Sequence, residues 1–153
     1  MSIAVQPEDF DLGQEVAALR GDDPGIGAVA SFVGLVRDMN QGQTGIGEMF
    51  LEHYPGMTEK ALADIEAQAR ARWDLRGVRV VHRVGRLAPR DQIVLVAVAA
   101  AHRGDAFQAC EFIMDYLKTQ APFWKREQTP TGSRWVEAKA DDEAAAQRWA
   151  GGD

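Results

Sequence analysis

The sequence has 153 residues, the size of one ordinary domain, which is long enough to bury a hydrophobic core. Apolar residues make up 46% and charged residues 26%, as is usual for a globular protein. The formal net charge of −6 at pH 7 argues against a nucleic-acid surface or an anionic membrane as the main partner. Any binding of anions must therefore come from a local cluster of cations.

Three features of the sequence bear on its compartment. The first ten residues, MSIAVQPEDF, lack the basic and long apolar regions of a signal peptide. The longest apolar run, residues 93–101, is too short to span a bilayer as a helix. A single cysteine, Cys110, rules out an internal disulfide and fits a reducing compartment. We therefore expect a cytoplasmic protein without a membrane partner.

The N-terminal part is predicted as a helix, a turn and a strand. A helix over 11–21 is indicated because Asp11 is a good N-cap, Gln14 follows three residues later, and apolar residues recur on one face. Residues 21–27, GDDPGIG, have the composition of a turn. The apolar run at 28–36 is typical of a buried strand.

A polar loop at 37–45 and a second strand at 48–54 come next. We expect this strand to pair with the preceding one as a hairpin. The helix that follows, within 55–73, has the period of an element packed against a core. Its expected core-facing residues are Leu62, Ile65, Ala69 and Trp73.

A second hairpin is expected in the middle of the chain. Residues 78–84 alternate in character, and residues 93–101 are apolar on both faces, so the latter should form a central strand covered on each side. Asp105 and Gln108 then have capping-box spacing, which predicts the start of a helix. Its expected core-facing residues are Phe107, Cys110, Ile113, Met114 and Leu117.

This helix should end near Lys118, because Pro122 removes the N–H that would bond the Lys118 carbonyl. Two short strands at 123–127 and 134–140 follow, and a terminal helix at 141–150 completes the chain. The mixture of helices and strand pairs, without repeats or a linker, predicts a single α+β domain.

Lysine is rare in this sequence, since only four of its 17 basic residues are lysines. Two of the four, Lys118 and Lys125, flank Pro122 among aromatic residues. A lysine amine can lose its proton when it is desolvated, whereas an arginine effectively cannot. The pair therefore indicates chemistry, and amines that reach solvent from a buried helix end are an equally weighted alternative.

Other cations also lie at the ends of predicted elements. Arg37 follows one apolar strand, and His102 and Arg103 follow the central strand. Lys125 and Arg126 lie beyond the helix break. If these ends meet, they would bind a phosphate or a carboxylate. Unrelated surface charges are the alternative.

The sequence gives little support for other kinds of site. The glycine pairs at 25–27 and 45–47 lack the third glycine of a dinucleotide-binding turn. The three histidines are scattered, so no metal is expected, and His82 is better explained as a hydrogen-bonded core residue. Cys110 lies in a core-facing stripe, which favours a buried and inert thiol.

Five segments of the chain resemble the catalytic (large) subunit of molybdopterin synthase: SFVGLVRDMN, LEHYPGMTEKAL, HRVGRLAP, VAVAAAHRGDAFQACEFIMDYLKTQAPFWKRE and RWVEA. The resemblance runs in order from about residue 27 to residue 138. It implies an α/β-hammerhead-type fold, with a mixed or antiparallel sheet and packed helices. We expect one domain over 1–153, with this core and a flexible tail at about 150–153.

The resemblance also implies a homodimer in which each protomer binds a small ubiquitin-like sulfur-carrier subunit, giving a heterotetramer. The carrier's C-terminal Gly-Gly, activated as a thiocarboxylate, supplies the sulfur. Two such sulfurs convert cyclic pyranopterin monophosphate into the dithiolene of molybdopterin, a step in molybdenum cofactor biosynthesis. The family is thus a sulfurtransferase, and no other cofactor is implied.

Site residues follow from the resemblance by position. Lys118 and Lys125 match the catalytic lysines, and a desolvated Lys118 is expected to have a lowered pKa and to move protons. Residues matching substrate- and anion-binding positions are Arg37, His102 and Arg103. Neighbouring positions expected to line the same pocket are Leu35, Val36, Arg126 and Glu127, with Phe32 and Met114 as apolar walls.

Two other functions remain open from the sequence. A non-catalytic anion-binding or scaffold module could keep the fold and bind a ubiquitin-like partner, in which case arginine would replace Lys118 freely. A different carrier-dependent sulfurtransferase with another phosphorylated substrate is the second. The pair of lysines argues against the first, and the extent of the resemblance argues against the second.

Overall fold

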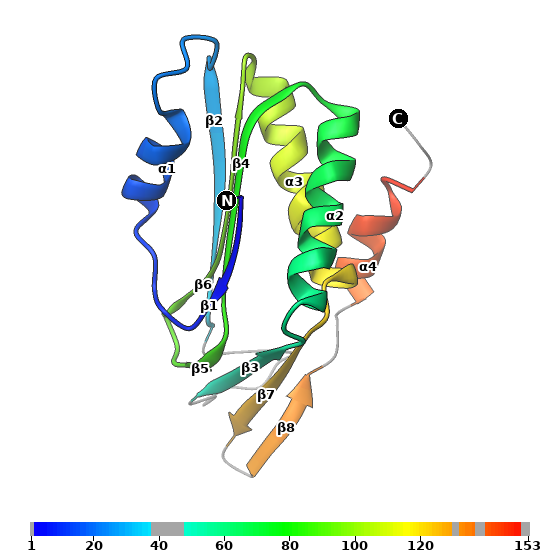
Figure 1. The fold of residues 1–153 in the computed structure, drawn as a ribbon. Helices are drawn as coiled ribbons and strands as arrows, with labels where there is room; N and C mark the ends of the chain where they lie inside the picture. Colours follow the sequence, from blue (N-terminus) through cyan, green and yellow to red (C-terminus); the bar gives the residue numbers. More distant parts are fainter. Residues whose placement is uncertain (1, 38–47, 130–131, 137–139, 151–153) are drawn as a thin grey trace.

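The computed structural model describes residues 2–37, 48–129, 132–136 and 140–150. It shows one small α+β protein with two four-stranded sheets and helices packed against the larger sheet (Figure 1). The predicted fold class is therefore confirmed. The expected tail at 150–153 lies, apart from Ala150, outside the described residues, as does most of the predicted loop at 37–45.

The larger sheet has the strand order β1-β4-β6-β2. Its first pair is parallel and the other two pairs are antiparallel. The strands are β1 (Ile3–Gln6), β4 (Leu75–Arg83), β6 (Gln92–Ala100) and β2 (Ala28–Leu35). The expected pairing of the strands in 78–101 is therefore confirmed, because β4 and β6 are antiparallel neighbours.

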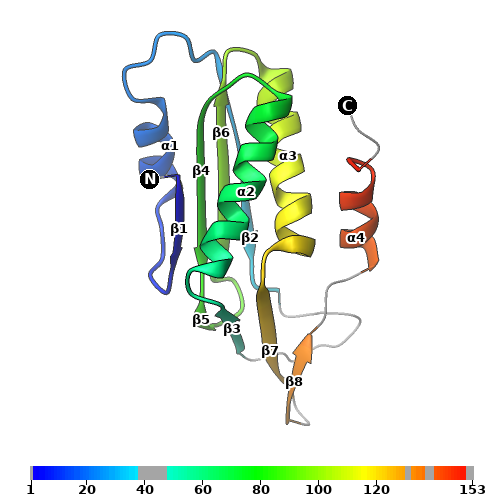
Figure 2. The ribbon, with the colours of Figure 1, turned by 45° about the vertical axis from the view of Figure 1, so that its right-hand side comes forward.

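Helices cover both faces of the larger sheet. One face carries α1 (Leu12–Arg20), and the other carries α2 (Met57–Arg72) and α3 (Arg103–Gln120), as Figures 1 and 2 show. Because β6 lies between these layers, eight of its nine residues are buried, which confirms the expected central strand. The main core lies under α2 and α3, and a small second cluster lies under α1.

Two predicted helix starts have different outcomes. The side chain of Asp11 accepts a hydrogen bond from the Gln14 amide, so the predicted N-cap of α1 is confirmed. The predicted start of α3 at Asp105 is wrong, since His102 is the N-cap and the helix begins at Arg103. The stripe of α2 is confirmed: Leu62, Ile65 and Ala69 are buried, and Trp73, the C-cap, is partly buried and packs against the same core.

Phe107 was expected in the core, and this prediction is wrong because 65% of its surface is exposed. The buried face of α3 is centred on Ala106, Ile113 and Leu117. At 100° per residue, Phe107 falls at the margin of that face. The predicted burial of Cys110 and Met114 is confirmed.

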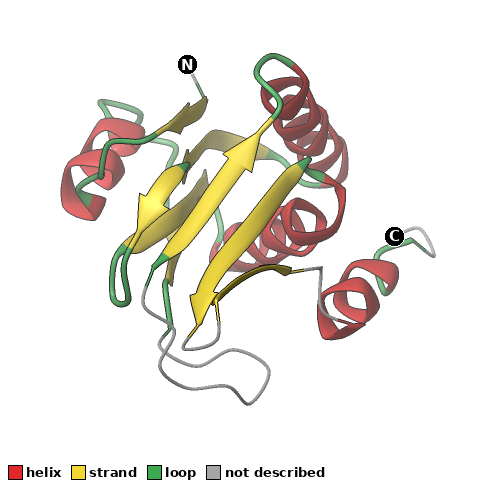
Figure 3. Ribbon diagram, turned by 90° about the horizontal axis from the view of Figure 1, so that it is seen from below, coloured by secondary structure: helices red, strands yellow, loops and turns green. Residues whose placement is uncertain are grey.

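The smaller sheet lies at one end of the larger one, and Figure 3 looks onto this end. Its strand order is β5-β3-β7-β8, with antiparallel pairs. The strands are β5 (Gly85–Leu87), β3 (Met49–His53), β7 (Phe123–Thr129) and β8 (Gly132–Val136). The expected hairpin of β2 with β3 is therefore wrong, because the two strands belong to different sheets.

The predicted burial of β2 is also wrong in part. Only Ala30 of this strand is buried, because β2 is an edge strand of the larger sheet. Phe32 is 42% exposed and Leu35 is 52% exposed. In the described part of the chain, β2 thus presents one unpaired edge and two exposed apolar side chains.

The terminal helix α4 (Ala140–Gln147) packs beside α3 (Figure 2). Trp149, just beyond it, donates from its indole nitrogen to Asp115 at 2.7 Å. The guanidinium of Arg72 donates to the Trp149 carbonyl at 2.9 Å and lies 5.0 Å from the centre of the Phe112 ring. These contacts hold the C-terminal segment against α2 and α3.

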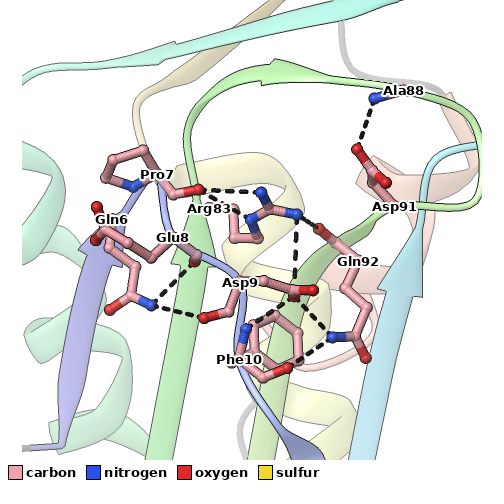
Figure 4. Close-up of polar contacts among 9 residues, drawn as sticks. All are labelled: Gln6, Pro7, Glu8, Asp9, Phe10, Arg83, Ala88, Asp91 and Gln92. Atoms are coloured by element: carbon pink, nitrogen blue, oxygen red, sulfur yellow. Dashed lines mark hydrogen bonds and ion pairs between the residues drawn. The ribbon is translucent and has the colours of Figure 1, made fainter.

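The segment between β1 and α1 is fixed by one arginine (Figure 4). Arg83 donates to the carbonyl oxygens of Pro7 and Gln92. The Gln92 amide in turn donates to the Asp9 carboxylate at 2.8 Å, and this bond and that from the Phe10 amide lower the pKa of Asp9.

No helix in the described part is long and apolar enough to cross a membrane.

Candidate functional site

Lys118 lies in the last turn of α3, as predicted. The helix ends at Gln120, and Ala121 has extended backbone angles of φ −76° and ψ 132°. This is the conformation favoured for a residue that precedes a proline. The helix therefore ends two residues after Lys118, the residue whose carbonyl Pro122 cannot bond because it has no N–H.

Beyond Pro122 the chain continues directly into β7, which pairs with β3. The backbone register places Lys125 opposite Leu51. Arg126 lies opposite Phe50, and Glu127 lies opposite Met49. The two lysines thus belong to two rigid elements, α3 and β7, that meet at the helix break.

Six side chains outside the predicted set of site residues make contacts at this helix break. The Thr58 hydroxyl donates to the Pro122 carbonyl at 2.9 Å. The ring of Phe123 stacks on His82, with ring centres 3.8 Å apart. Trp124 donates from its indole nitrogen to Glu52 at 3.0 Å, and its ring meets that of Tyr54 edge to face.

The sequence contained a signal for one of these residues. Thr58 precedes Leu62, Ile65 and Ala69 at helical spacing, so it is a polar residue at the head of an apolar stripe. The expected role of His82 as a buried, hydrogen-bonded residue is confirmed: it is 5% exposed, with Nδ1 2.8 Å from the Arg83 carbonyl oxygen. Its contact with Phe123 depends on tertiary structure and had no local signal.

Arg37 follows β2 at the same end of the larger sheet as the smaller sheet. Val36 is buried, and its backbone bonds to Asp91 and Arg90 fix the chain where Arg37 leaves the strand. Arg37 itself is exposed. Met114, one turn before Lys118 on α3, is 8% exposed and belongs to the main core.

His102 and Arg103 lie at the opposite end of the larger sheet and are both exposed. They follow the last residue of β6, which pairs with the first residue of β2, whereas Arg37 follows the last residue of β2. Eight residues at about 3.3 Å each separate these two ends by roughly 25 Å. One chain therefore does not bring all the predicted cations together.

Cys110 is a buried thiol, as predicted. Its sulfur donates to the Val96 carbonyl at 3.7 Å, and burial raises its pKa to about 11. Near neutral pH this thiol is almost entirely protonated, which makes it a poor nucleophile. Among the described residues, no group of three or more His, Cys, Asp or Glu side chains could hold a metal ion.

The structure thus defines a class: an α+β protein that presents cationic residues at the ends of its central helix and strands. The family model described as MoaE protein matches residues 5–120. The chain belongs to this family, which confirms the resemblance seen in the sequence.

Named relatives and solved structures agree with this assignment. The molybdopterin synthase catalytic subunit of Ralstonia nicotianae is 66% identical over 97% of this chain and 84% of that protein. The MoaE protein structure from Burkholderia ambifaria is 60% identical and covers 97% of both chains with a TM-score of 0.84. The molybdopterin synthase structure from Staphylococcus aureus is 32% identical, with a TM-score of 0.81 over 89% of this chain and 97% of the other.

Proposed function

We propose that this protein is a sulfurtransferase, the catalytic subunit of a molybdopterin synthase. Its substrates are a thiocarboxylated small carrier subunit and cyclic pyranopterin monophosphate, and its product carries the dithiolene of molybdopterin. The observation that carries the proposal is the 66% identity, over 97% of the chain, to a protein named as such a catalytic subunit. The helix break between Lys118 and Lys125 supports it, because it places the two lysine positions on adjoining rigid elements.

The chemistry follows from the charges of the two substrates. A cyclic phosphate and a thiocarboxylate are both anions, so cations must hold them together against their mutual repulsion. Such positioning of reactants contributes up to roughly 7–11 kcal/mol to catalysis in favourable cases. Lys118 moves protons as sulfur adds and oxygen leaves, and Lys125 binds an anion. The carrier supplies the sulfur, so neither Cys110 nor a bound cofactor takes part. We place the reaction in the cytoplasm.

The remaining cations come from a second copy of the chain. Among the described strands, β2 pairs only with β6, and it carries exposed Phe32 and Leu35, as expected of a strand that meets a partner. A two-fold axis that sets two β2 strands antiparallel brings the Arg37 end of one chain beside the Ala28 end of the other. In that partner Ala28 pairs with Ala100, and His102 and Arg103 follow after Ala101.

The function is tested by incubating the protein with thiocarboxylated carrier and cyclic pyranopterin monophosphate. Mass spectrometry should detect the dithiolene product and the carrier with an ordinary C-terminal carboxylate, in a ratio of one product to two carriers. Carrier that binds without any product would instead identify a scaffold module. A product from another phosphorylated substrate alone would identify a different sulfurtransferase.

A further inference from the structure

Thr58 is a fully buried polar side chain at the first turn of α2. Its hydroxyl oxygen accepts a hydrogen bond from the Tyr54 amide at 3.0 Å, where β3 has just ended. The same hydroxyl donates its proton to the Pro122 carbonyl at 2.9 Å, across 64 residues of sequence. One hydroxyl therefore joins the end of β3, the start of α2 and the break that follows α3.

Pro122 offers few other ways to be held. It has no N–H, so its carbonyl is the polar backbone group through which the chain can be fixed at this residue. The next amide, that of Phe123, turns back to the Ala121 carbonyl at 2.8 Å. The Phe123 ring then stacks on His82 of β4, with an angle of 17° between the rings. The helix break is thus held by α2 through the hydrogen bond from Thr58 and by β4 through the stacked ring of His82.

The helix break also sets the geometry of the proposed catalytic pair. Lys118 lies four residues before Pro122 on α3, and Lys125 lies three residues after it on β7. Because helix and strand are each rigid, the backbone angles at residues 121 and 122 decide how the two lysine positions face each other. A small change in these backbone angles therefore changes the relative position of the two lysines.

We propose that Thr58 is a positioning residue for the sulfur-transfer reaction: its hydroxyl fixes the helix break and thereby holds Lys118 and Lys125 in the relative position that the reaction requires. This inference rests on the proposed function. The Thr58 side chain is fully buried, and its hydroxyl bonds to backbone groups of Tyr54 and Pro122, so we expect no direct contact with substrate. Its effect should therefore fall on turnover more than on substrate binding.

The test compares Thr58→Val with Thr58→Ser. Valine keeps the branched shape and removes the hydroxyl, whereas serine keeps the hydroxyl. With saturating thiocarboxylated carrier, Thr58→Val should lower kcat by about 10- to 100-fold, as expected for a misplacement near 1 Å. The KM for the cyclic pterin should stay within about threefold. Thr58→Ser should recover kcat to within about threefold of the original protein.

Ile65→Val is the matched control, because Ile65 is 2% exposed and lies two turns further along the same face of α2. It loosens the contact of α2 with the core without touching Pro122, so kcat should not change. Unchanged kcat in folded Thr58→Val would overturn the inference. An equal loss of kcat in Thr58→Ser would also overturn it. So would a loss of kcat in Ile65→Val that is in proportion to the fall in melting temperature of that variant.

A second measurement keeps this inference separate from the proposed function. Hydrogen exchange of the Tyr54 amide reports directly on its bond to Thr58, and that of the Phe123 amide reports on the turn at Pro122. Both amides should exchange at least tenfold faster in Thr58→Val and at nearly the original rate in Thr58→Ser. If the unmodified chain made no dithiolene, the proposed function would fail, while unchanged Phe123 exchange in Thr58→Val would refute the grip on the break itself.

Discussion

Lys118 differs from the 13 arginines of this chain in one chemical respect, because its amine can give up a proton. Lys118→Arg and Lys118→Ala should therefore both lose product formation, by about 10²- to 10⁴-fold, as is typical when a general acid or base is removed. Lys125→Ala should lose less, since an anion contact alone disappears. Near-normal turnover by a folded Lys118→Arg protein would show that a fixed positive charge is sufficient.

Cys110 provides the complementary prediction, on stability without function. Cys110→Ala leaves a small cavity and should lower the free energy of unfolding by about 1–2 kcal/mol, measured by urea denaturation. Product formation from thiocarboxylated carrier should be unchanged, because the sulfur comes from the partner. A folded Cys110→Ala protein without turnover would place the thiol in the reaction.

The loss caused by Cys110→Ala should also depend on pH. Burial raises the pKa of this thiol from 9.0 to about 11. Below pH 9 both states keep the proton, and the thiol contributes its full stability. Between pH 9 and pH 11 the unfolded chain loses the proton while the folded chain retains it, so this contribution declines. The stability difference between the two proteins should therefore narrow over that range, and a constant difference would contradict the raised pKa.

At the scale of elements, the turn from β6 into α3 depends on Gly27. Its amide donates to the Ala100 carbonyl at 2.9 Å, and a Cβ at this position would overlap the Ala101 carbonyl oxygen. Gly27→Ala should therefore displace the start of α3 and lower the free energy of unfolding by roughly 1–3 kcal/mol. It should also weaken binding of the cyclic pterin, because His102 and Arg103 follow this turn.

Gly104→Ala is the control for that substitution. Gly104 lies in the first turn of α3, and a Cβ there would meet nothing within 4 Å. Alanine should raise stability by up to about 1 kcal/mol, since it restricts the unfolded chain. If both variants were equally destabilised in urea denaturation, close packing at Gly27 would not be the cause.

The elements themselves could largely be predicted from sequence, whereas their partners could not. Asp11 and Pro122 mark the boundaries of helices through local rules, and the apolar run of β6 predicts a central strand. The pairing of β2 with β6 instead of β3 follows from packing of the whole chain, which leaves no local trace. For the same reason, the sequence identified cations at element ends but not which ends meet.

At the scale of the whole molecule, the isolated protein should have about twice the mass of one chain, 16.8 kDa, at micromolar concentration in light scattering. A protein that stays monomeric under these conditions would contradict the two-fold arrangement. In a monomer, His102 and Arg103 would lie too far from Lys118 to share a site with it.

Mixed dimers test how the sites are shared. Lys118→Ala and Arg103→Ala should each be nearly inactive alone. In a dimer with one copy of each, both changes fall in one shared site and the other site is intact. Refolding the two variants together in equal amounts should therefore restore about a quarter of the original activity, because half the dimers are mixed and each has one of two sites. No recovery in verified mixed dimers would place the whole site within one chain.

The helix α3 separates Arg103 at its first turn from Lys118 at its last, by 15 positions along the helix or roughly 22 Å. Its length is therefore a constraint on evolution different from that on any single side chain. Substitutions on its outer side, such as at Phe107, leave both ends in place. An inserted or deleted residue would rotate one end by about 100° relative to the other and shift it by about 1.5 Å. Insertions and deletions in this gene should thus be tolerated in its surface loops and eliminated between these two codons.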